Sequence, residues 1–335
     1  MILHRHSGRA GTGVAVLSVL LLSVSGCARV DDGGVRAYVD EAIDGLSEGY
    51  YADSREWYDA IDEELPGLYA AESIPDTYAA LRRLTSIAGG KHSFFQTLAE
   101  AAGWERPYAS GDVPTPMVTY QGAVGTVEIP EFSSAHQDER DEYLGAAAGV
   151  FDSRNAQAAC GWVIDLRSNR GGDFFTMLAA VSPLLEDGDV EAFRDRDGDA
   201  TRVSVSGNTV TWGGELGRDG REFGSLPGEP RKLARLPIAI VQSGMTASAA
   251  EALIIAFAGQ PHVETFGSQS AGLTTMNDGF DLPDGANVTL SFALMEDREG
   301  KVYEEGIAPD HPMELYDSSA LGAAQEWVMR QCAGP

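Results

Sequence analysis

The chain has 335 residues, which is long enough for two domains. Its 51 acidic residues outnumber its 24 basic residues, so the formal net charge at pH 7 is −27. So acidic a surface excludes nucleic acid as an expected partner and favours cationic ligands over anionic ones.

The N-terminus has the layout of a bacterial export signal. Two arginines precede the apolar run 14–22, and the sequence Val-Ser-Gly-Cys27 follows it. The run is too short to be a convincing membrane span. The Val-Ser-Gly-Cys ending resembles a bacterial lipobox, which predicts a lipoprotein signal peptide over 1–26 and a lipid on Cys27. The alternative is an ordinary signal peptide in which Cys27 has no role. We therefore expect a bacterial protein on the outer face of the cell membrane, attached through Cys27 and a polar tether over 27–34.

Two further cysteines, Cys160 and Cys332, remain in the mature chain. In an oxidising exterior they could pair, or they could remain as two buried free thiols. The sequence does not show whether their Cα atoms approach within bonding range, so both alternatives stay open.

Residues 35–100 are predicted to form an N-terminal helical domain. Apolar residues recur at helical spacing in three runs, over 35–46, 57–65 and 73–87. Gly89-Gly90 ends the third run, because glycine readily adopts the conformation that terminates a helix. His92 follows in a loop flanked by bulky apolar residues. Taken alone, it is more often a structural histidine than a catalytic one, unless a nucleophile elsewhere pairs with it.

Strand and helix patterns alternate after a linker rich in proline and glycine at about 103–116. The predicted elements are strands at 117–120, 123–129 and 161–166 and a helix near 137–151. Such alternation favours an α/β core over a β-sandwich or a helical bundle. The polar, glycine-rich region 189–235 shows β alternation and predicts a small β cap above a cleft, with a floppy surface insert as the alternative.

The strand at 161–166 runs directly into Asp165-Leu-Arg-Ser-Asn-Arg-Gly171-Gly172. Paired glycines after a strand allow a sharp turn that presents backbone N–H groups to a nearby group. A phosphate-binding loop is the alternative, but no Gly-Lys-Ser/Thr follows and the surroundings are acidic.

A second strand–turn–helix pattern surrounds Ser248. The apolar run 237–241 ends in a Gln-Ser-Gly turn, and helix-forming residues follow over 249–257, so Ser248 should lie at the first turn of that helix. Free N–H groups and the helix dipole would there stabilise an oxyanion beside a nucleophile. The alternative is that Thr246 or Ser248 only caps the helix, with Glu251 closing a capping box.

Four segments stand in this order: Lys91-His92-Ser93, Asp165 to Gly172, Thr246-Ala-Ser248-Ala-Ala-Glu251 and Gly306-Ile-Ala-Pro-Asp310. Their combination resembles the tail-specific, or C-terminal processing, proteases of serine peptidase family S41. The resemblance implies an α/β fold with a crotonase-like core of ββα units. It places the protease core at 117–316, with the cap insertion at about 189–235, between the N-terminal helical domain over 35–100 and a C-terminal helix or tail over 317–335.

The chain departs from many members of that family. They use a serine–lysine dyad, whereas the corresponding place here carries Leu273, and the chain has no lysines besides Lys91, Lys232 and Lys301. There is also no room for a PDZ module between His92 and the next strand. These departures resemble the branch that contains the tricorn core and the nisin-resistance proteins, which are membrane-tethered exported peptidases with a serine–histidine pair.

The resemblance implies acyl transfer. Ser248 would attack the peptide carbonyl, and His92 would take its proton and later return it to the leaving amine. Backbone N–H groups of Ala249 and of Gly171 or Gly172 would receive the oxyanion.

The carboxylate that orients the histidine would be Glu304 or Glu305, and the spacing does not choose between them. Both glutamates could instead belong to a solvated turn. Lys91 stands where tricorn-like relatives have a serine, so a full tetrad is not expected. Glu251 is predicted to close the helix cap rather than act on substrate.

The predicted function is an exported, lipid-anchored serine endopeptidase that acts on peptides or protein C-terminal tails, and the acidic chain suits a cationic peptide. The alternative is a noncatalytic peptide- or ligand-binding protein on the same fold, against which the presence of both Ser248 and His92 argues. An α/β-hydrolase esterase would carry Gly-x-Ser-x-Gly, which the residues around Ser248 do not match. No metal-ligand spacing is present, so no metal or other cofactor is predicted.

Overall fold

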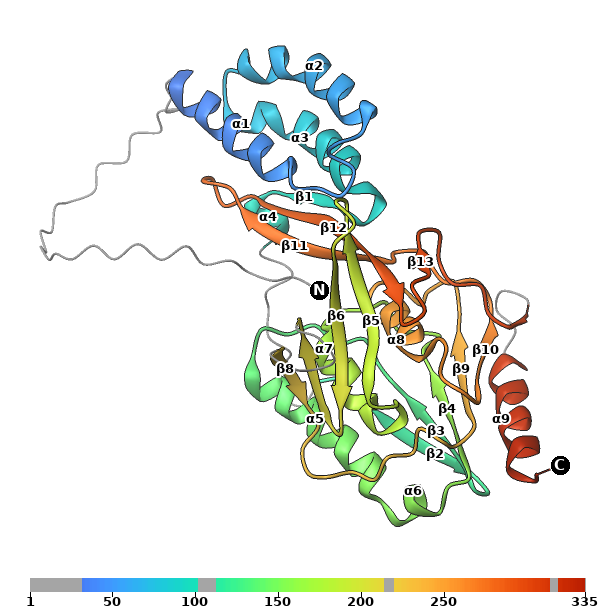
Figure 1. Cartoon of the computed structure of the whole chain (residues 1–335). Coiled ribbons are helices and arrows are strands. Elements are labelled where there is room, and N and C mark those ends of the chain that lie inside the picture. Colours follow the sequence, from blue (N-terminus) through green and yellow to red (C-terminus); the bar gives the residue numbers. More distant parts are fainter. Residues whose placement is uncertain (1–31, 102–112, 214–219, 314–318, 335) are drawn as a thin grey trace, which may run out of the picture. The chain divides into compact units, whose positions relative to one another are not determined.

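The computed structural model describes residues 32–101, 113–213, 220–313 and 319–334, which form two compact units (Figure 1). Of the described residues, those from 113 to 276 and from 292 onward form the large unit, and those from 32 to 101 together with 277–291 form the small unit. The predicted signal peptide and Cys27 lie outside the described residues. Within the described ranges, no helix is long and apolar enough to cross a membrane.

The small unit is built on helices whose apolar faces pack together. Its helical elements are α1 (Asp32–Leu46), α2 (Arg55–Tyr69), α3 (Ile74–Gly89), η1 (Gly90–His92) and α4 (Leu98–Ala101). Ser54 caps α2 by accepting the N–H of Trp57. Pro75 lies in the first turn of α3, where a missing N–H costs nothing.

Residues 277–291 complete the small unit from the far end of the chain. β1 (Phe94–Gln96) pairs antiparallel with the first residues of β12 (Asn287–Asp297), and β11 (Thr275–Asp281) also pairs with β12. Buried residues of this segment, Leu282, Ala286, Val288 and Leu290, share one hydrophobic core with the helices.

The large unit contains a sheet with the strand order β14-β10-β9-β4-β3-β2. The strands are β2 (Met117–Gln121), β3 (Val124–Glu128), β4 (Gly161–Asp165), β9 (Ile238–Gln242), β10 (Val263–Gly267) and β14 (His311–Pro312). All neighbours pair in parallel except β2, which pairs antiparallel with β3 at the edge. The central strands β4 and β9 are almost wholly buried, as expected of parallel strands covered on both faces.

Helices cover both faces of this sheet. The helical elements are α5 (Gln137–Asp152), α6 (Arg154–Ala158), α7 (Phe174–Val181), η2 (Ser182–Leu184), α8 (Ala249–Phe257) and α9 (Ser319–Cys332). Val163 and Val241 pack with α9, whereas Trp162, whose side chain points to the opposite face, contacts Phe151 of α5.

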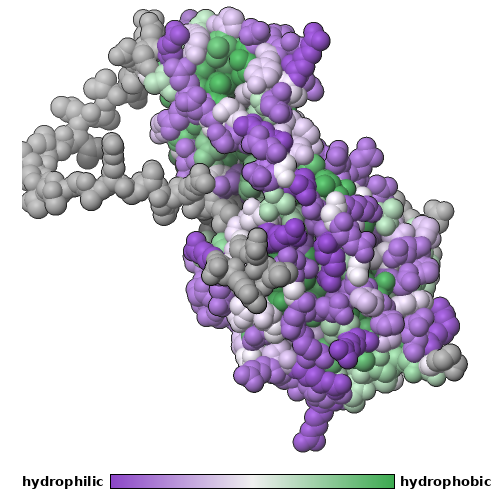
Figure 2. Space-filling model, viewed as in Figure 1, coloured by the Kyte–Doolittle hydropathy of each residue, from purple (hydrophilic) through white to green (hydrophobic). Residues whose placement is uncertain are grey.

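Antiparallel strands form the second sheet of the large unit. They are β5 (Gly188–Asp195), β6 (Ala200–Ser206), β7 (Thr209–Trp212) and β8 (Arg221–Ser225), each paired with the next. β5 also pairs with residues 293–297 of β12, which pairs in turn with β13 (Val302–Tyr303). The mixed α/β class predicted from the sequence is confirmed. Hydrophilic residues cover most of the face shown in Figure 2, as the acidic composition requires.

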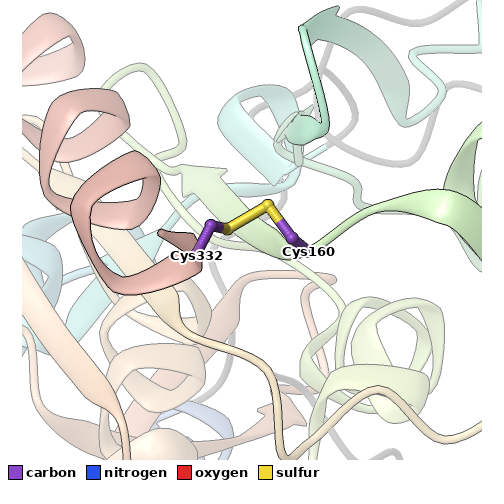
Figure 3. Close-up of a disulfide and its surroundings, with 2 residues drawn as sticks. All are labelled: Cys160 and Cys332. Atoms are coloured by element: carbon purple, nitrogen blue, oxygen red, sulfur yellow. A yellow bond between two sulfur atoms is a disulfide. The ribbon is translucent and has the colours of Figure 1, made fainter. Parts of the chain in front are cut away.

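Cys160 and Cys332 form a disulfide (Figure 3). Cys160 precedes β4 and Cys332 is the last residue of α9; their Cα atoms lie 5.6 Å apart although 172 residues separate them in sequence. Of the two alternatives that the sequence left open, the structure therefore has the disulfide. The cross-link fastens the end of α9 to the sheet that the helix covers.

Replacing both cysteines by serine should lower the free energy of unfolding by about 2–5 kcal/mol, because a cross-link across a long loop restricts the unfolded chain. Urea titrations of both proteins, with and without a reductant, measure this loss. The reductant should move wild type to the midpoint of the variant and leave the variant unchanged. Equal midpoints for oxidised wild type and variant would contradict the prediction.

Candidate active site

Two loops meet where β4 and β9 end. These strands are parallel neighbours, so the segments that follow them emerge at the same edge of the sheet. The Thr246 hydroxyl donates to the carbonyl of Leu166 at 2.9 Å, and the Ser243 hydroxyl donates to the carbonyl of Arg167 at 2.6 Å. The loop that leads to Ser248 is therefore fixed to the loop that contains the paired glycines.

Ser248 has a strained backbone. It lies at the N-cap of α8 with φ 55° and ψ −122°, and the residue is 8% exposed. An ordinary cap residue is extended, whereas this conformation costs a non-glycine residue about 1–3 kcal/mol and persists only where its surroundings impose it. Strain of this kind gathers at functional sites, and a sharp strand-to-helix turn is how α/β enzymes expose a nucleophilic serine.

Glu251 holds this turn in place. Its side chain is fully buried and accepts the N–H groups of Ser248 at 2.8 Å, Leu273 at 2.7 Å and Gly272 at 2.7 Å, as well as the Ser270 hydroxyl. Backbone N–H groups can only donate, so both carboxylate oxygens act as acceptors. Glu251 thus closes the helix cap and also binds segment 270–273 to the nucleophile turn.

Gly171 packs directly against the serine. Its φ is 104°, and a Cβ added there would lie 2.8 Å from both the Cβ of Ser248 and the carbonyl oxygen of Ala247. The Gly171 N–H donates to Oδ1 of Asn169 at 2.8 Å. By contrast, the N–H groups of Gly172 and Ala249 donate to no other group among the described residues.

Asn169 is a structural element of the site that the sequence analysis missed. It is 1% exposed. Its side-chain N–H donates to the carbonyl of Ile129 at 2.9 Å, and its backbone carbonyl accepts the N–H of Ala247 at 3.2 Å. Asn169 therefore joins three segments around the glycines. A buried asparagine in a turn that ends a strand is the signal that could have revealed it.

A small pocket lies beside the serine. It is lined by Ser248, Phe174, Phe193, Ala249, Ala252, Thr275, Met276 and Met295. Most of these side chains are apolar.

His92 belongs to the small unit, whereas Ser248 belongs to the large unit. His92 is the last residue of η1, and its carbonyl accepts an N–H of the Asn277 side chain at 2.8 Å. Burial lowers the pKa of His92 from its ordinary 6.5 to about 4. The imidazole is therefore neutral at neutral pH and able to accept a proton.

Glu304 and Glu305 lie in the large unit and are exposed, in the turn after β13. The carbonyl of Glu305 accepts an N–H of Gln269 at 3.0 Å. Within the described part of the chain, neither carboxylate has a hydrogen bond or ion pair of its own. The same residues contain no group of three or more histidine, cysteine, aspartate or glutamate side chains arranged to hold a metal ion.

The four bonds at Glu251 predict that Glu251→Gln is strongly destabilising. An amide keeps one acceptor oxygen but turns an NH2 group toward backbone donors, which should cost about 2–4 kcal/mol of unfolding free energy. Urea titration measures the loss.

Glu191→Gln is the matched control. Glu191 is also fully buried, in β5, and its carboxyl oxygens have no hydrogen-bond partner among the described residues. Burial raises the pKa of Glu191 well above its usual range, so the site disfavours the charged carboxylate and a neutral amide suits it better than it suits the site of Glu251. We expect a much smaller loss than at Glu251, and equal losses would refute the special role of Glu251.

The chain is similar in sequence to a nisin-resistance protein and to carboxy-terminal processing proteases. The nisin-resistance protein of Lactococcus lactis subsp. lactis is 27% identical over 296 residues, which cover 88% of this chain and 87% of the relative. The carboxy-terminal processing protease CtpA of Bacillus subtilis is 25% identical over 199 residues, which cover 59% of this chain and 36% of the relative.

Solved structures share the fold. A lipoprotein from Streptococcus agalactiae aligns with a TM-score of 0.72 at 23% identity, covering 94% of this chain and all of the other, and the photosystem II D1 C-terminal processing protease aligns with a TM-score of 0.55 at 16% identity, covering 83% and 93%. Residues 123–313, more than half of the chain, match the sequence model of peptidase family S41. The chain therefore belongs to peptidase family S41.

Proposed function

We propose that the protein is a serine endopeptidase whose nucleophile is Ser248. The observation that carries the proposal is the strained backbone of Ser248 at the N-terminus of α8, where Gly171 packs directly against the serine. The hydroxyl attacks a peptide carbonyl and forms an acyl-enzyme, and the leaving amine takes a proton. Water then releases the acyl group.

The proposed oxyanion hole consists of the N–H groups of Gly172 and Ala249. Gly171 is the poorer candidate, because its N–H is already donated to Asn169. An oxyanion-hole donor contributes about 3–4 kcal/mol to the stability of the transition state. The positive end of the α8 dipole adds to this stabilisation.

We assign the general base to His92. Its neutral imidazole can take the serine proton and return it to the leaving amine. Glu304 or Glu305 is the proposed carboxylate partner. Leu273 cannot serve as a base, and Lys91 is the competing candidate.

The proposed substrates are peptides or unfolded C-terminal tails of proteins. The net charge of −27 favours a cationic peptide. One relative is named a nisin-resistance protein, and nisin is a peptide. We further propose that the sheets of the large unit form a crotonase-like core with β5–β8 as its cap. A lipid on Cys27 would hold the protein on the outer face of a bacterial membrane, as the sequence ending at Cys27 suggests.

Labelling with a fluorophosphonate tests the nucleophile and the base together. The chain from residue 28 should be labelled at Ser248, not at all after Ser248→Ala, and at least about a hundredfold more slowly after His92→Ala, since a general base contributes about 10²–10⁴-fold. Lys91→Ala should leave the labelling rate unchanged. Labelling that persists in His92→Ala but is lost in Lys91→Ala would transfer the role of base to Lys91.

The pH dependence of labelling provides a second check. Only neutral His92 accepts a proton, and its pKa is about 4, so the rate should stay level as the pH falls through 6.5 and decline near 4. A decline centred at 6.5 would contradict His92, with its lowered pKa, as the base.

Gly171→Ala should slow labelling at least about a hundredfold, because a Cβ at 2.8 Å from Ser248 must displace the nucleophile turn. Gly149→Ala is the control: Gly149 lies in α5, and an added Cβ there meets no atom within 4 Å. Unchanged labelling of Gly171→Ala would show that the close contact with Ser248 is not needed.

A further inference from the structure

A chain of buried polar side chains in the small unit ends at the backbone of His92. Asn277 donates from Nδ2 to the carbonyl of His92 at 2.8 Å and accepts the Ser291 hydroxyl at Oδ1 at 2.7 Å. The N–H of Ser291 donates to the Ser93 hydroxyl oxygen at 2.8 Å, and that hydroxyl donates to the Ser291 hydroxyl at 3.2 Å. The hydrogen-bond network therefore also includes Ser93, the residue that follows His92.

These side chains are removed from water. Asn277 is 2% exposed, Ser291 is fully buried and Ser93 is 8% exposed. Burying so many polar groups is unfavourable unless each is bonded, so a satisfied network of this kind fixes one arrangement of the backbone.

The surrounding backbone is shaped to accommodate the network. A Cβ at Gly89 would lie 2.0 Å from the hydroxyl oxygen of Ser93, so this helix residue must be glycine for Ser93 to occupy its position. The carbonyl of Ser291 accepts the N–H of Tyr50, in the connection between α1 and α2, at 2.8 Å. Segments from three parts of the chain therefore hold the turn that carries His92.

We propose that Asn277 is a positioning residue for His92, supported by Ser291 and Ser93. This inference rests on the proposed function, in which His92 is the base. Asn277 donates to the backbone carbonyl of His92 and so fixes the position of the His92 main chain. The position of the His92 Cα and the orientation of its side chain are restricted as a result. Since a base must lie within hydrogen-bond reach of the proton it accepts, a small displacement of His92 reduces proton transfer.

The test compares Asn277→Ala with Ser291→Ala and with the control Asn287→Ala, all in the chain from residue 28. Asn287 lies on the same strand as Ser291 and donates to Asp281 at 2.9 Å, with no bond to His92 or its network. The rate of fluorophosphonate labelling is measured per folded molecule, with the folded fraction taken from circular dichroism. The titration of the His92 imidazole is followed by NMR with labelled histidine and assigned with His92→Ala.

We expect labelling of Asn277→Ala to slow by about ten- to a hundredfold per folded molecule. The titration midpoint of His92 should rise from about 4 toward 6.5, because an imidazole released from its fixed position gains water. Ser291→Ala should shift both quantities in the same direction by less, and it carries the test if Asn277→Ala does not fold. Asn287→Ala should match wild type in both.

A purely structural role for Asn277 would lower stability but leave both quantities at their wild-type values, and this result would overturn the inference. If wild type itself is not labelled at Ser248, the proposed function fails, and the histidine titration still decides the role of Asn277. An unmoved midpoint in Asn277→Ala and Ser291→Ala then overturns the inference, and a raised midpoint supports it.

Discussion

The buried carboxylate of Glu251 is the interaction on which the candidate active site depends. Its bonds to the N–H groups of Ser248, Gly272 and Leu273 are made inside the large unit, where water cannot replace them. These bonds help to hold the turn at Ser248 in a conformation that an ordinary cap residue does not adopt.

The parallel sheet explains why residues far apart in sequence share this site. β4 and β9 are neighbours, so the glycine turn at 171–172 and the turn before α8 leave the sheet at one edge. Hydrogen bonds between the two loops, together with those that Asn169 accepts from Gly171 and Ala247, hold the loops together.

Local pattern predicted much of this architecture, and long-range pairing accounts for what it missed. The strand–turn–helix around Ser248 and the glycine turn were evident, because apolar runs and glycines are local signals. The sequence did not show that the Gly171 N–H is donated to Asn169, since that bond depends on how the turn folds. Nor could spacing show that Asn277 would reach the backbone of His92, because 185 residues separate them.

The disulfide also bears on when the large unit can be completed. Val163 and Val241 present apolar side chains to α9, and no other described helix packs on that core cluster. β4 is made long before that helix, because Cys332 follows Cys160 by 172 positions in the sequence. Until α9 packs on the sheet, these apolar side chains have no helix over them, and an uncovered apolar face of this kind favours contacts with chaperones or neighbouring chains. Once the disulfide has formed, α9 stays bound to the sheet and the apolar face remains covered.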